Sequence, residues 1–423
     1  MASKSIEQIV MLPFMAHGHL IPFLALARQI HQATGFKISI ASTPLNIQYL
    51  SSTFNSSSDE PENDHIHLLE LPFCNTDNGL PENSENLSLD SIGKLFSASL
   101  SLRKPFHSLV SDIAAKQGHP PLCIISDVFL GWATEVASSL GTVNVTFSTG
   151  GAYGTLAYSS LWLNLPHRGR SDSDEFHLPG FPDSCRFHVN QLHHFLRNAD
   201  GTDSWSKFFQ SQISLSMQSF GWLCNTAEEF EPAGLEWLRN FLKLPVWAIG
   251  PLLPPMVLNN DHSSLSKCIE WLESHSPASV LYISFGSQNT ISPSQMMELA
   301  IGLEESAKPF VWGGDMRSKA MVIKEQLRAS VRDEGEDKGS SVKALDDLVK
   351  TLQSKWQMIN SINNICHPGM VNEKATAPAT ATAGRDAFFH RQLDSASSAD
   401  TAPKFFRFSI FTTRHAKTYL VNT

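Results

Sequence analysis

Two histidines stand in one short segment between a predicted strand and a predicted helix. His17 and His19 flank Gly18, soon after the apolar run at residues 9–14. Such a run is typical of a buried parallel strand, and ligands of open α/β sheets bind at the carboxyl ends of strands. A histidine there can accept a proton near neutral pH if another group orients its ring, and Gly18 would let a ligand approach the backbone. The residues alone leave open that a histidine here is buried or caps the helix.

An acidic residue ends a second apolar run. Asp127 follows residues 122–126, so it also belongs to the carboxyl edge if that run is a strand of the same sheet. Two residues at the ends of strands in one sheet can meet, and an aspartate that holds a histidine is a common pairing of a base with its orienting group. The alternative is that Asp127 only caps the helix that follows it.

Two turns carry the hydroxyl and glycine residues that suit phosphate. Residues 147–151 (FSTGG) and 284–287 (SFGS) each end a predicted strand, although ordinary turn chemistry explains them equally well. Neither turn has the spacing of a dinucleotide-binding or P-loop motif, which argues against a dehydrogenase or a P-loop enzyme. We predict no metal site, because the histidine group lacks a helical pair with carboxylates. That group comprises His188, His193 and His194.

Composition excludes several classes of partner. The 423 residues are 42% hydrophobic and carry a net charge of -9, which allows large cores and argues against nucleic acid. Six scattered cysteines form no C-x-x-C pair, so neither zinc nor a disulfide framework is expected. No apolar run approaches the ~18 residues of a membrane span. The N-terminal residues lack the apolar core of a signal peptide and are followed at once by the first predicted strand. We therefore expect a cytoplasmic protein with no membrane span.

Strand-like and helix-like segments alternate over residues 7–312, which predicts a parallel sheet covered by helices. Residues 165–202 interrupt the alternation with Pro, Gly and five His, which indicates a surface excursion over a pocket. Residues 244–255 are interpreted as the connection between two domains. The expected strands are 9–14, 37–41, 66–71, 122–126, 143–147, 222–224, 279–285 and 309–312. The expected helices are 19–33, 91–115, 131–140, 205–216, 268–273, 294–306, 319–332 and 342–352.

Seven segments, in order along the chain, resemble landmarks of the plant UDP-sugar-dependent glycosyltransferases of small molecules. They are residues 13–22 (PFMAHGHLIP), 124–129 (IISDVF), 225–230 (NTAEEF), 247–252 (WAIGPL), 268–273 (CIEWLE), 282–287 (YISFGS) and 309–312 (PFVW). The resemblance implies a GT-B fold of the α/β class, with two Rossmann-like domains facing a cleft. Residues 1–245 would be the acceptor-binding domain and 246–353 a truncated donor-binding domain, followed by a disordered tail at 354–423.

The same resemblance assigns roles. His19 would be the general base that deprotonates an acceptor hydroxyl, and Asp127 would hold its imidazole. Gly18 and Thr149 would contact the donor, and the excursion at 165–202 would wall the acceptor pocket. The activity implied is an inverting hexosyltransferase that moves a sugar, glucose by expectation, from a UDP-sugar to a hydroxyl of a flavonoid or similar phenolic. It needs no cofactor or metal and acts as a monomer. Residues expected to line the diphosphate are Ser284, Gly286 and Ser287.

One long family signature is missing from the sequence. After the FVW strand, members of this family carry a donor-binding stretch that begins with WAPQ, contains HCGWNS and closes with Glu and an acidic-Gln pair. In this sequence the stretch is absent between Gly313 and Arg317. The residues that follow resemble the family's final helices. The alternative function is therefore a catalytically inactive remnant, or a splicing or gene-model product, that at most binds small phenolics.

Overall fold

The computed structural model describes residues 7–55, 65–73, 83–84, 87, 91–252, 271–276, 279–283, 293–312, 330 and 338–365. Three predicted donor residues, Ser284, Gly286 and Ser287, lie outside the described residues. So do most of the predicted helix at 319–332 and the tail from residue 366 onward.

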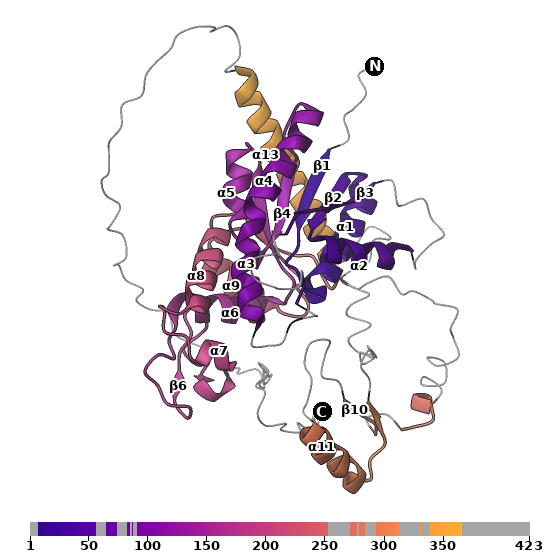
Figure 1. Cartoon of the computed structure of the whole chain (residues 1–423), viewed down its shortest axis with the longest axis vertical. Coiled ribbons are helices and arrows are strands. Elements are labelled where there is room, and N and C mark those ends of the chain that lie inside the picture. Colours follow the sequence, from indigo (N-terminus) through magenta and orange to yellow (C-terminus); the bar gives the residue numbers. More distant parts are fainter. Residues whose placement is uncertain are drawn as a thin grey trace.

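A seven-stranded sheet, parallel throughout, forms the centre of the chain in the order β3-β2-β1-β4-β5-β8-β9 (Figure 1). The predicted α/β class is therefore confirmed, and the six strands expected between residues 9 and 224 all form. The strands are β1 (Gln8–Leu12), β2 (Lys37–Ser42), β3 (Ile66–Glu70), β4 (Cys123–Asp127), β5 (Val143–Ser148), β8 (Gly221–Cys224) and β9 (Val246–Ala248).

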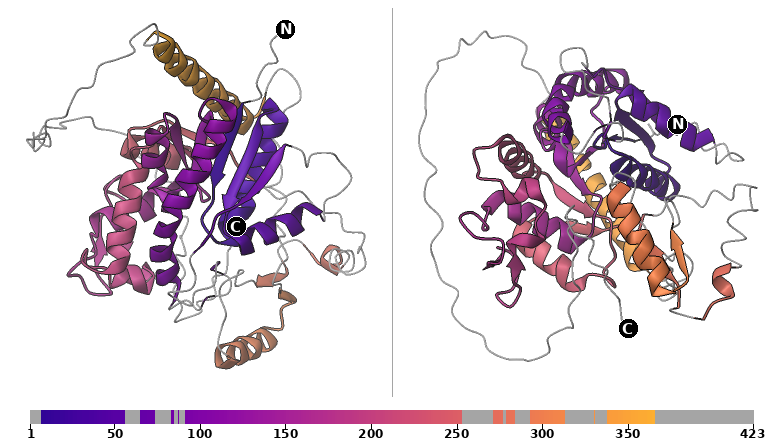
Figure 2. Two further views of the ribbon diagram at one scale, coloured as in Figure 1. Left: turned by 45° about the horizontal axis from the view of Figure 1, so that its top comes forward. Right: turned by 60° about the horizontal axis from the view of Figure 1, so that its bottom comes forward.

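Helices cover both faces of this sheet, as Figure 2 shows. Alternate residues of β1 point to opposite faces: Val10 and Leu12 join one core, Ile9 and Met11 the other. The first face carries α3 (Ile92–Ala98), α4 (Arg103–Gln117), α5 (Ala133–Ser139), α6 (Ala152–Asn164) and α8 (Ser204–Ser216), and the second carries α1 (His17–Thr34) and α2 (Pro44–Asn55). Helix α9 (Pro232–Leu242) contributes to a third cluster beside β8 and β9.

The single helix expected at 91–115 is divided. A 3-10 turn, η3 (Ser99–Leu102), separates α3 from α4. The hydroxyl groups of Ser99 and Ser101 donate to carbonyl oxygens three residues earlier, at 2.6 and 2.7 Å, so they compete with the helical backbone bonds. Pro105 then supplies no backbone donor in the first turn of α4.

Residues 165–202 leave the sheet, as expected. They form a small antiparallel pair, β6 (Glu175–Phe176) with β7 (Phe187–His188), and two short helical turns, η5 (Val189–Gln191) and α7 (His194–Arg197). Its core residues, among them Phe176 and Leu178, belong to the same cluster as α6 and α8. The excursion is therefore packed onto the first face of the sheet.

A separate β-α-β unit follows later in the chain. The strands β10 (Leu281–Ile283) and β11 (Phe310–Trp312) pair in parallel, and α11 (Pro293–Ser306) connects them. These are three of the elements expected from the sequence for the second domain.

The structure corrects both domain boundaries. The division at 245/246 falls inside the large sheet, because β9 (Val246–Ala248) pairs with β8. The end at 353 falls inside helix α13 (Ser340–Ile365), which continues 12 residues into the segment expected to be a disordered tail. Three leucines of α13, at 345, 348 and 352, are at most 2% exposed and join the core of the second face. This helix therefore packs on the N-terminal sheet.

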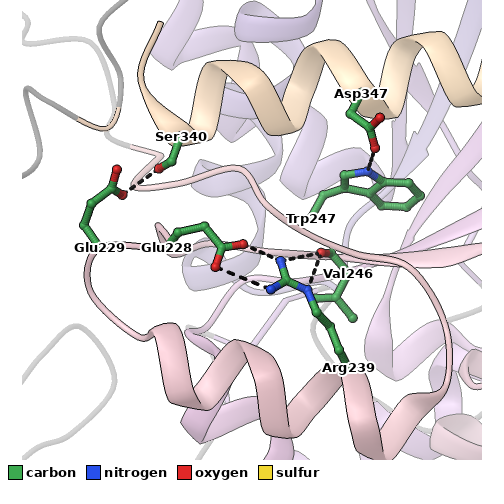
Figure 3. A network of polar contacts seen from close by, with 7 residues as sticks. All are labelled: Glu228, Glu229, Arg239, Val246, Trp247, Ser340 and Asp347. Atoms are coloured by element: carbon green, nitrogen blue, oxygen red, sulfur yellow. Dashed lines mark hydrogen bonds and ion pairs between the residues drawn. The ribbon is translucent and has the colours of Figure 1, made fainter. Parts of the chain in front are cut away.

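Polar contacts tie α13 to the same sheet (Figure 3). The indole Nε1 of Trp247 donates to Oδ2 of Asp347 at 2.8 Å, and the Ser340 hydroxyl donates to Oε2 of Glu229 at 2.6 Å. Beside them the guanidinium of Arg239 donates to the Glu228 carboxylate and to the carbonyl oxygen of Val246. The edge strand β9 is thereby covered by α13 and α9 together.

Candidate functional site

The two residues expected to form a catalytic pair meet at the carboxyl edge of the sheet. Parallel pairing of β1 with β4 sets Leu12 opposite Ser126, so the segments that follow each strand lie side by side. Nδ1 of His19, in the first turn of α1, lies 2.6 Å from Oδ2 of Asp127, the last residue of β4. The meeting predicted from strand ends is confirmed.

Asp127 combines both roles that the sequence left open. Its Oδ1 accepts the backbone N–H of Phe129 at 3.0 Å and caps the 3-10 turn η4 (Val128–Leu130), while its Oδ2 faces His19. An ionised carboxylate can only accept hydrogen bonds, so a neutral imidazole paired with it carries its proton on Nδ1 and keeps a lone pair on Nε2. This tautomer is the one that a general base requires.

The two members of the pair differ in exposure. The side chain of His19 is 20% exposed, whereas that of Asp127 is 0% exposed. A substrate can therefore reach the imidazole but not the carboxylate. Because the buried Asp127 is fixed by the Phe129 amide, it can orient the ring and stabilise the positive charge that the imidazole would acquire on taking a proton.

Aromatic rings surround the imidazole. The rings of Phe14 and Phe129 lie 5.6 and 5.3 Å from that of His19, measured between centroids, and Phe96 stacks on Phe14 at 4.6 Å. The cluster continues through Phe129 to Tyr158, which is 36% exposed and 5.8 Å away. Sequence reasoning missed this apolar wall, because its members come from four separate parts of the chain.

The two histidines of the first motif have different surroundings. The ring of His17 stacks on Tyr49 of α2, with centroids 3.6 Å apart and planes 13° from parallel. Gly18 between them is exposed, and a Cβ at this position would meet no atom within 4 Å. Neither packing nor a left-handed backbone therefore requires glycine here. Helix α1 also begins without a side-chain cap or an acidic residue in its first turn, so its first N–H groups face this edge.

The turn at residues 147–151 is largely used by the protein itself. The buried Ser148 hydroxyl lies 2.7 Å from that of Thr155. The first N–H groups of α6, at Ala152 and Tyr153, donate to the Glu231 carboxylate at 2.8 and 3.2 Å. A phosphate cannot occupy a helix N-terminus that already holds a carboxylate. Thr149, which is half-buried at the same sheet edge as His19, is the remaining donor candidate of this turn.

Of the three histidines predicted as a group in the excursion, the structure describes the side chains of His188 and His193 but not that of His194. His188 lies 3.4 Å from Glu175 across the β6–β7 pair. In the part of the chain that the structure describes, no three His, Cys, Asp or Glu side chains gather as metal ligands would. None of the described helices combines the length and apolar character that a membrane crossing needs.

A hollow of about 570 Å³ lies between α9, β9 and α13, away from the catalytic pair. Its polar lining is paired within the protein: Arg239 with Glu228, and Trp247 with Asp347. It contains neither His19 nor Asp127. The site that the geometry supports is therefore the edge around His19.

A parallel α/β sheet with a histidine–aspartate pair at its carboxyl edge is the arrangement of an α/β enzyme. Comparison with known proteins identifies the family. Residues 6–168 match the family model for the N-terminal domain of glycosyltransferases. The chain is 45% identical over 311 residues to crocetin glucosyltransferase 3 of Crocus sativus, covering 70% of this chain and 63% of that protein. It is 37% identical over 342 residues to UDP-glycosyltransferase 92A1 of Arabidopsis thaliana, covering 78% and 67%.

The fold agrees with solved structures of this kind. A Glycyrrhiza uralensis enzyme, UGT73P12, complexed with glycyrrhetinic acid 3-O-monoglucuronide, superposes with a TM-score of 0.60 at 24% identity, covering 79% of this chain and 68% of that one. The chain belongs to the plant UDP-glycosyltransferase family, and its fold is the GT-B type. It spans about two thirds of the length of the curated relatives it matches.

Proposed function

We propose that this chain transfers a sugar from a UDP-sugar to a hydroxyl of a small plant metabolite, with His19 as the general base. The observation that carries the proposal is the 2.6 Å contact between Nδ1 of His19 and the buried Asp127 carboxylate, beside an apolar aromatic wall. Nε2 of His19 would take the proton of the acceptor hydroxyl. The oxygen would then attack the anomeric carbon as its bond to the UDP oxygen breaks, and UDP would leave with the electron pair.

The proposed reaction inverts the anomeric carbon. A single base on one side of the sugar implies attack opposite to the leaving UDP, so the anomeric carbon inverts in one displacement. No covalent sugar–protein intermediate is needed, and no metal or cofactor enters the reaction as proposed. The positive charge formed on His19 is balanced by Asp127, which cannot be reached by solvent.

For the donor we propose UDP-glucose, in line with the name of the Crocus sativus relative, a glucosyltransferase. Gly18 and Thr149 would contact it from the edge of the large sheet, since Gly18 faces open space and Thr149 lies in the adjacent turn. Ser284, Gly286 and Ser287 would line the diphosphate. The acceptor is proposed to be a flat apolar phenolic such as a flavonoid, because Phe129 and Tyr158 offer it aromatic faces.

The surroundings proposed for the chain are the cytoplasm, where it would act as a monomer. The three cysteines that the structure describes, Cys123, Cys185 and Cys224, are free thiols. Burial raises the pKa of the Cys224 thiol to about 12, so it remains a neutral core residue. Free cysteines of this kind fit a reducing compartment.

A second candidate is binding of phenolics without sugar transfer. The observation that favours it is the missing WAPQ-to-HCGWNS signature between Gly313 and Arg317. Without those donor contacts, UDP would be held by few groups and its departure would lose stabilisation. The acceptor wall and the His19–Asp127 pair would be unaffected, because both belong to the large sheet.

Calorimetric titration and a transfer assay separate the two candidates. The full chain is titrated with UDP and with a panel of flavonoids and simple phenols, then incubated with UDP-glucose and each phenol. Sugar transfer that is lost in His19→Ala but kept in His107→Ala, an exposed histidine of α4, supports the enzyme. Phenol binding without UDP binding and without product supports the second candidate. Binding of neither ligand contradicts both.

A further inference from the structure

The segment at residues 225–231 (NTAEEFE) directly follows strand β8 and contains the family landmark at residues 225–230, which has no role so far. The two ends of this segment contact the turn that carries Thr149 and the start of α6. Asn225 lies beside the turn that carries Thr149, and Glu231 precedes α9 and reaches the start of α6. The segment thus touches the turn on both sides of the proposed donor contact.

Asn225 holds the first half of that turn. Its backbone N–H is shared between the carbonyl oxygens of Ser148, at 3.3 Å, and Gly150, at 3.2 Å. These two residues flank Thr149, so one donor fixes the peptide groups on either side of it. This shared bond restrains the backbone of the turn that carries Thr149.

Glu231 holds the second half. Its Oε2 and Oε1 accept the N–H groups of Ala152 and Tyr153, the first two residues of α6. Gly151 is the N-cap residue of α6 and offers no side chain for this purpose. A Cβ on Gly151 would collide with the Glu231 carboxylate, so the carboxylate would have to move from its place at the start of α6. A carboxylate at this end of a 13-residue helix also interacts favourably with the helix dipole.

The same segment fixes the chain that leads toward the second half. Oδ1 of Asn225 accepts the N–H of Leu252 at 2.7 Å, and the N–H of Gly250 donates to the carbonyl oxygen of Thr226 at 2.8 Å. One short segment therefore sets the place of Thr149 and the direction in which residues 249–252 leave β9.

We propose that Glu231 is a positioning residue that, together with the backbone N–H of Asn225, holds Thr149 at the donor side of the site. This inference rests on the proposed function for the role of Thr149, but the geometry it concerns can be observed without turnover. Neither residue is expected to touch the sugar. Their effect is to keep the Thr149 turn in one conformation, where its hydroxyl can meet a donor phosphate or sugar.

The experiment uses the full chain labelled at threonine methyl groups, with the Thr149 resonance assigned by its loss in Thr149→Ser. Glu231→Gln keeps the size of the side chain but removes its charge and turns one acceptor into an NH2 group. The Thr149 methyl resonance is expected to shift or to split, while that of the buried Thr146 of β5 stays in place. Glu229→Gln is the matched control, because Glu229 lies in the same segment but accepts Ser340 of α13.

Donor affinity gives the second readout. Glu231→Gln is expected to weaken UDP-glucose binding about tenfold, which is about 1.4 kcal/mol of binding free energy, with phenol affinity unchanged. A variant that lowers the melting temperature but leaves both the Thr149 resonance and donor affinity unchanged would overturn the inference. If Glu231→Gln does not fold, Gly151→Ala is used in its place. The added Cβ of this variant would push the Glu231 carboxylate away from the start of α6. A wild-type chain that binds no UDP-glucose refutes the proposed function, and the methyl resonance still tests the positioning.

Discussion

Replacement of Asp127 by asparagine tests the catalytic pair with the smallest change of shape. Asp127 accepts Phe129 N–H through Oδ1 at 3.0 Å and holds Nδ1 of His19 through Oδ2 at 2.6 Å. Asparagine has one accepting oxygen. If that oxygen stays with Phe129, the NH2 group faces His19, and Nδ1 must become an acceptor. The ring proton then moves to Nε2, the nitrogen that would take the proton of the acceptor hydroxyl.

The magnitude follows from this change of tautomer. An imidazole protonated at Nε2 cannot act as a base, and the same change in a serine protease costs about 10⁴ in kcat. We expect Asp127→Asn to lower kcat by about 10³ to 10⁴, which is roughly 4 to 5.5 kcal/mol of activation free energy. Loss of the charge-assisted bond should lower the free energy of unfolding by about 1 to 3 kcal/mol, so the variant should still fold.

Two assays are needed. Glucoside formation at saturating UDP-glucose gives kcat, and the ¹⁵N chemical shifts of the His19 ring give the tautomer whether or not the chain turns over. Asp183→Asn is the matched control, because Asp183 lies 3.4 Å from His177 but is 98% exposed. The reasoning is refuted if Asp127→Asn keeps more than about a tenth of the wild-type kcat, or if its His19 remains protonated at Nδ1.

Three further predictions concern other parts of the chain. Leu348→Ala in α13, at a side chain 1% exposed, should lower the free energy of unfolding by about 2 to 5 kcal/mol in urea; a loss below about 0.5 kcal/mol would contradict the packing of α13 in the core. Gly18→Ala should not lower the melting temperature, because Gly18 lies in helix α1 and its Cβ would meet no atom, and it should weaken UDP-glucose binding; unchanged affinity would remove Gly18 from the donor site. Burial of Asp203 raises the pKa of its carboxyl, but hydrogen bonds from Ser206 at the N-terminus of α8 outweigh this effect and lower the pKa of Asp203 to about 2. Stability from Asp203 is thus present above its unfolded pKa near 3.9 and lost as pH falls toward 2, so Asp203→Asn should flatten the pH dependence of the melting temperature in that window; an unchanged slope would contradict the assignment.

The large sheet and the catalytic pair were predictable because their signals are local. Apolar runs of five or six residues mark β1 and β4. The residues that follow these strands therefore lie at the carboxyl edge of the sheet. The pairing of β1 with β4 brings His19 and Asp127 together although 108 positions separate them. Polar residues at strand ends therefore indicated the site before any contact was known.

Features that depend on packing were not predictable. Helix α6 buries polar residues, among them Thr155, Ser159 and Ser160, beside its apolar ones, so no polar stripe marks the helix in the sequence, and the segment is absent from the expected helices. The cap of α6 comes from Glu231, which lies 79 positions from Ala152, and nothing in the sequence links the two. The docking of α13 on the first sheet is also a matter of tertiary contacts, since its amphipathic pattern shows an apolar face but not the partner of that face.

The most direct test of the account is the rate of glucoside formation by the full chain, measured by mass spectrometry with UDP-glucose and a flavonoid panel. The account predicts a product with an inverted anomeric centre from the wild-type chain and none above background from His19→Ala. Equal rates from the two proteins, or a product of retained configuration, would contradict the role of His19. Absence of product from the wild-type chain would contradict sugar transfer itself.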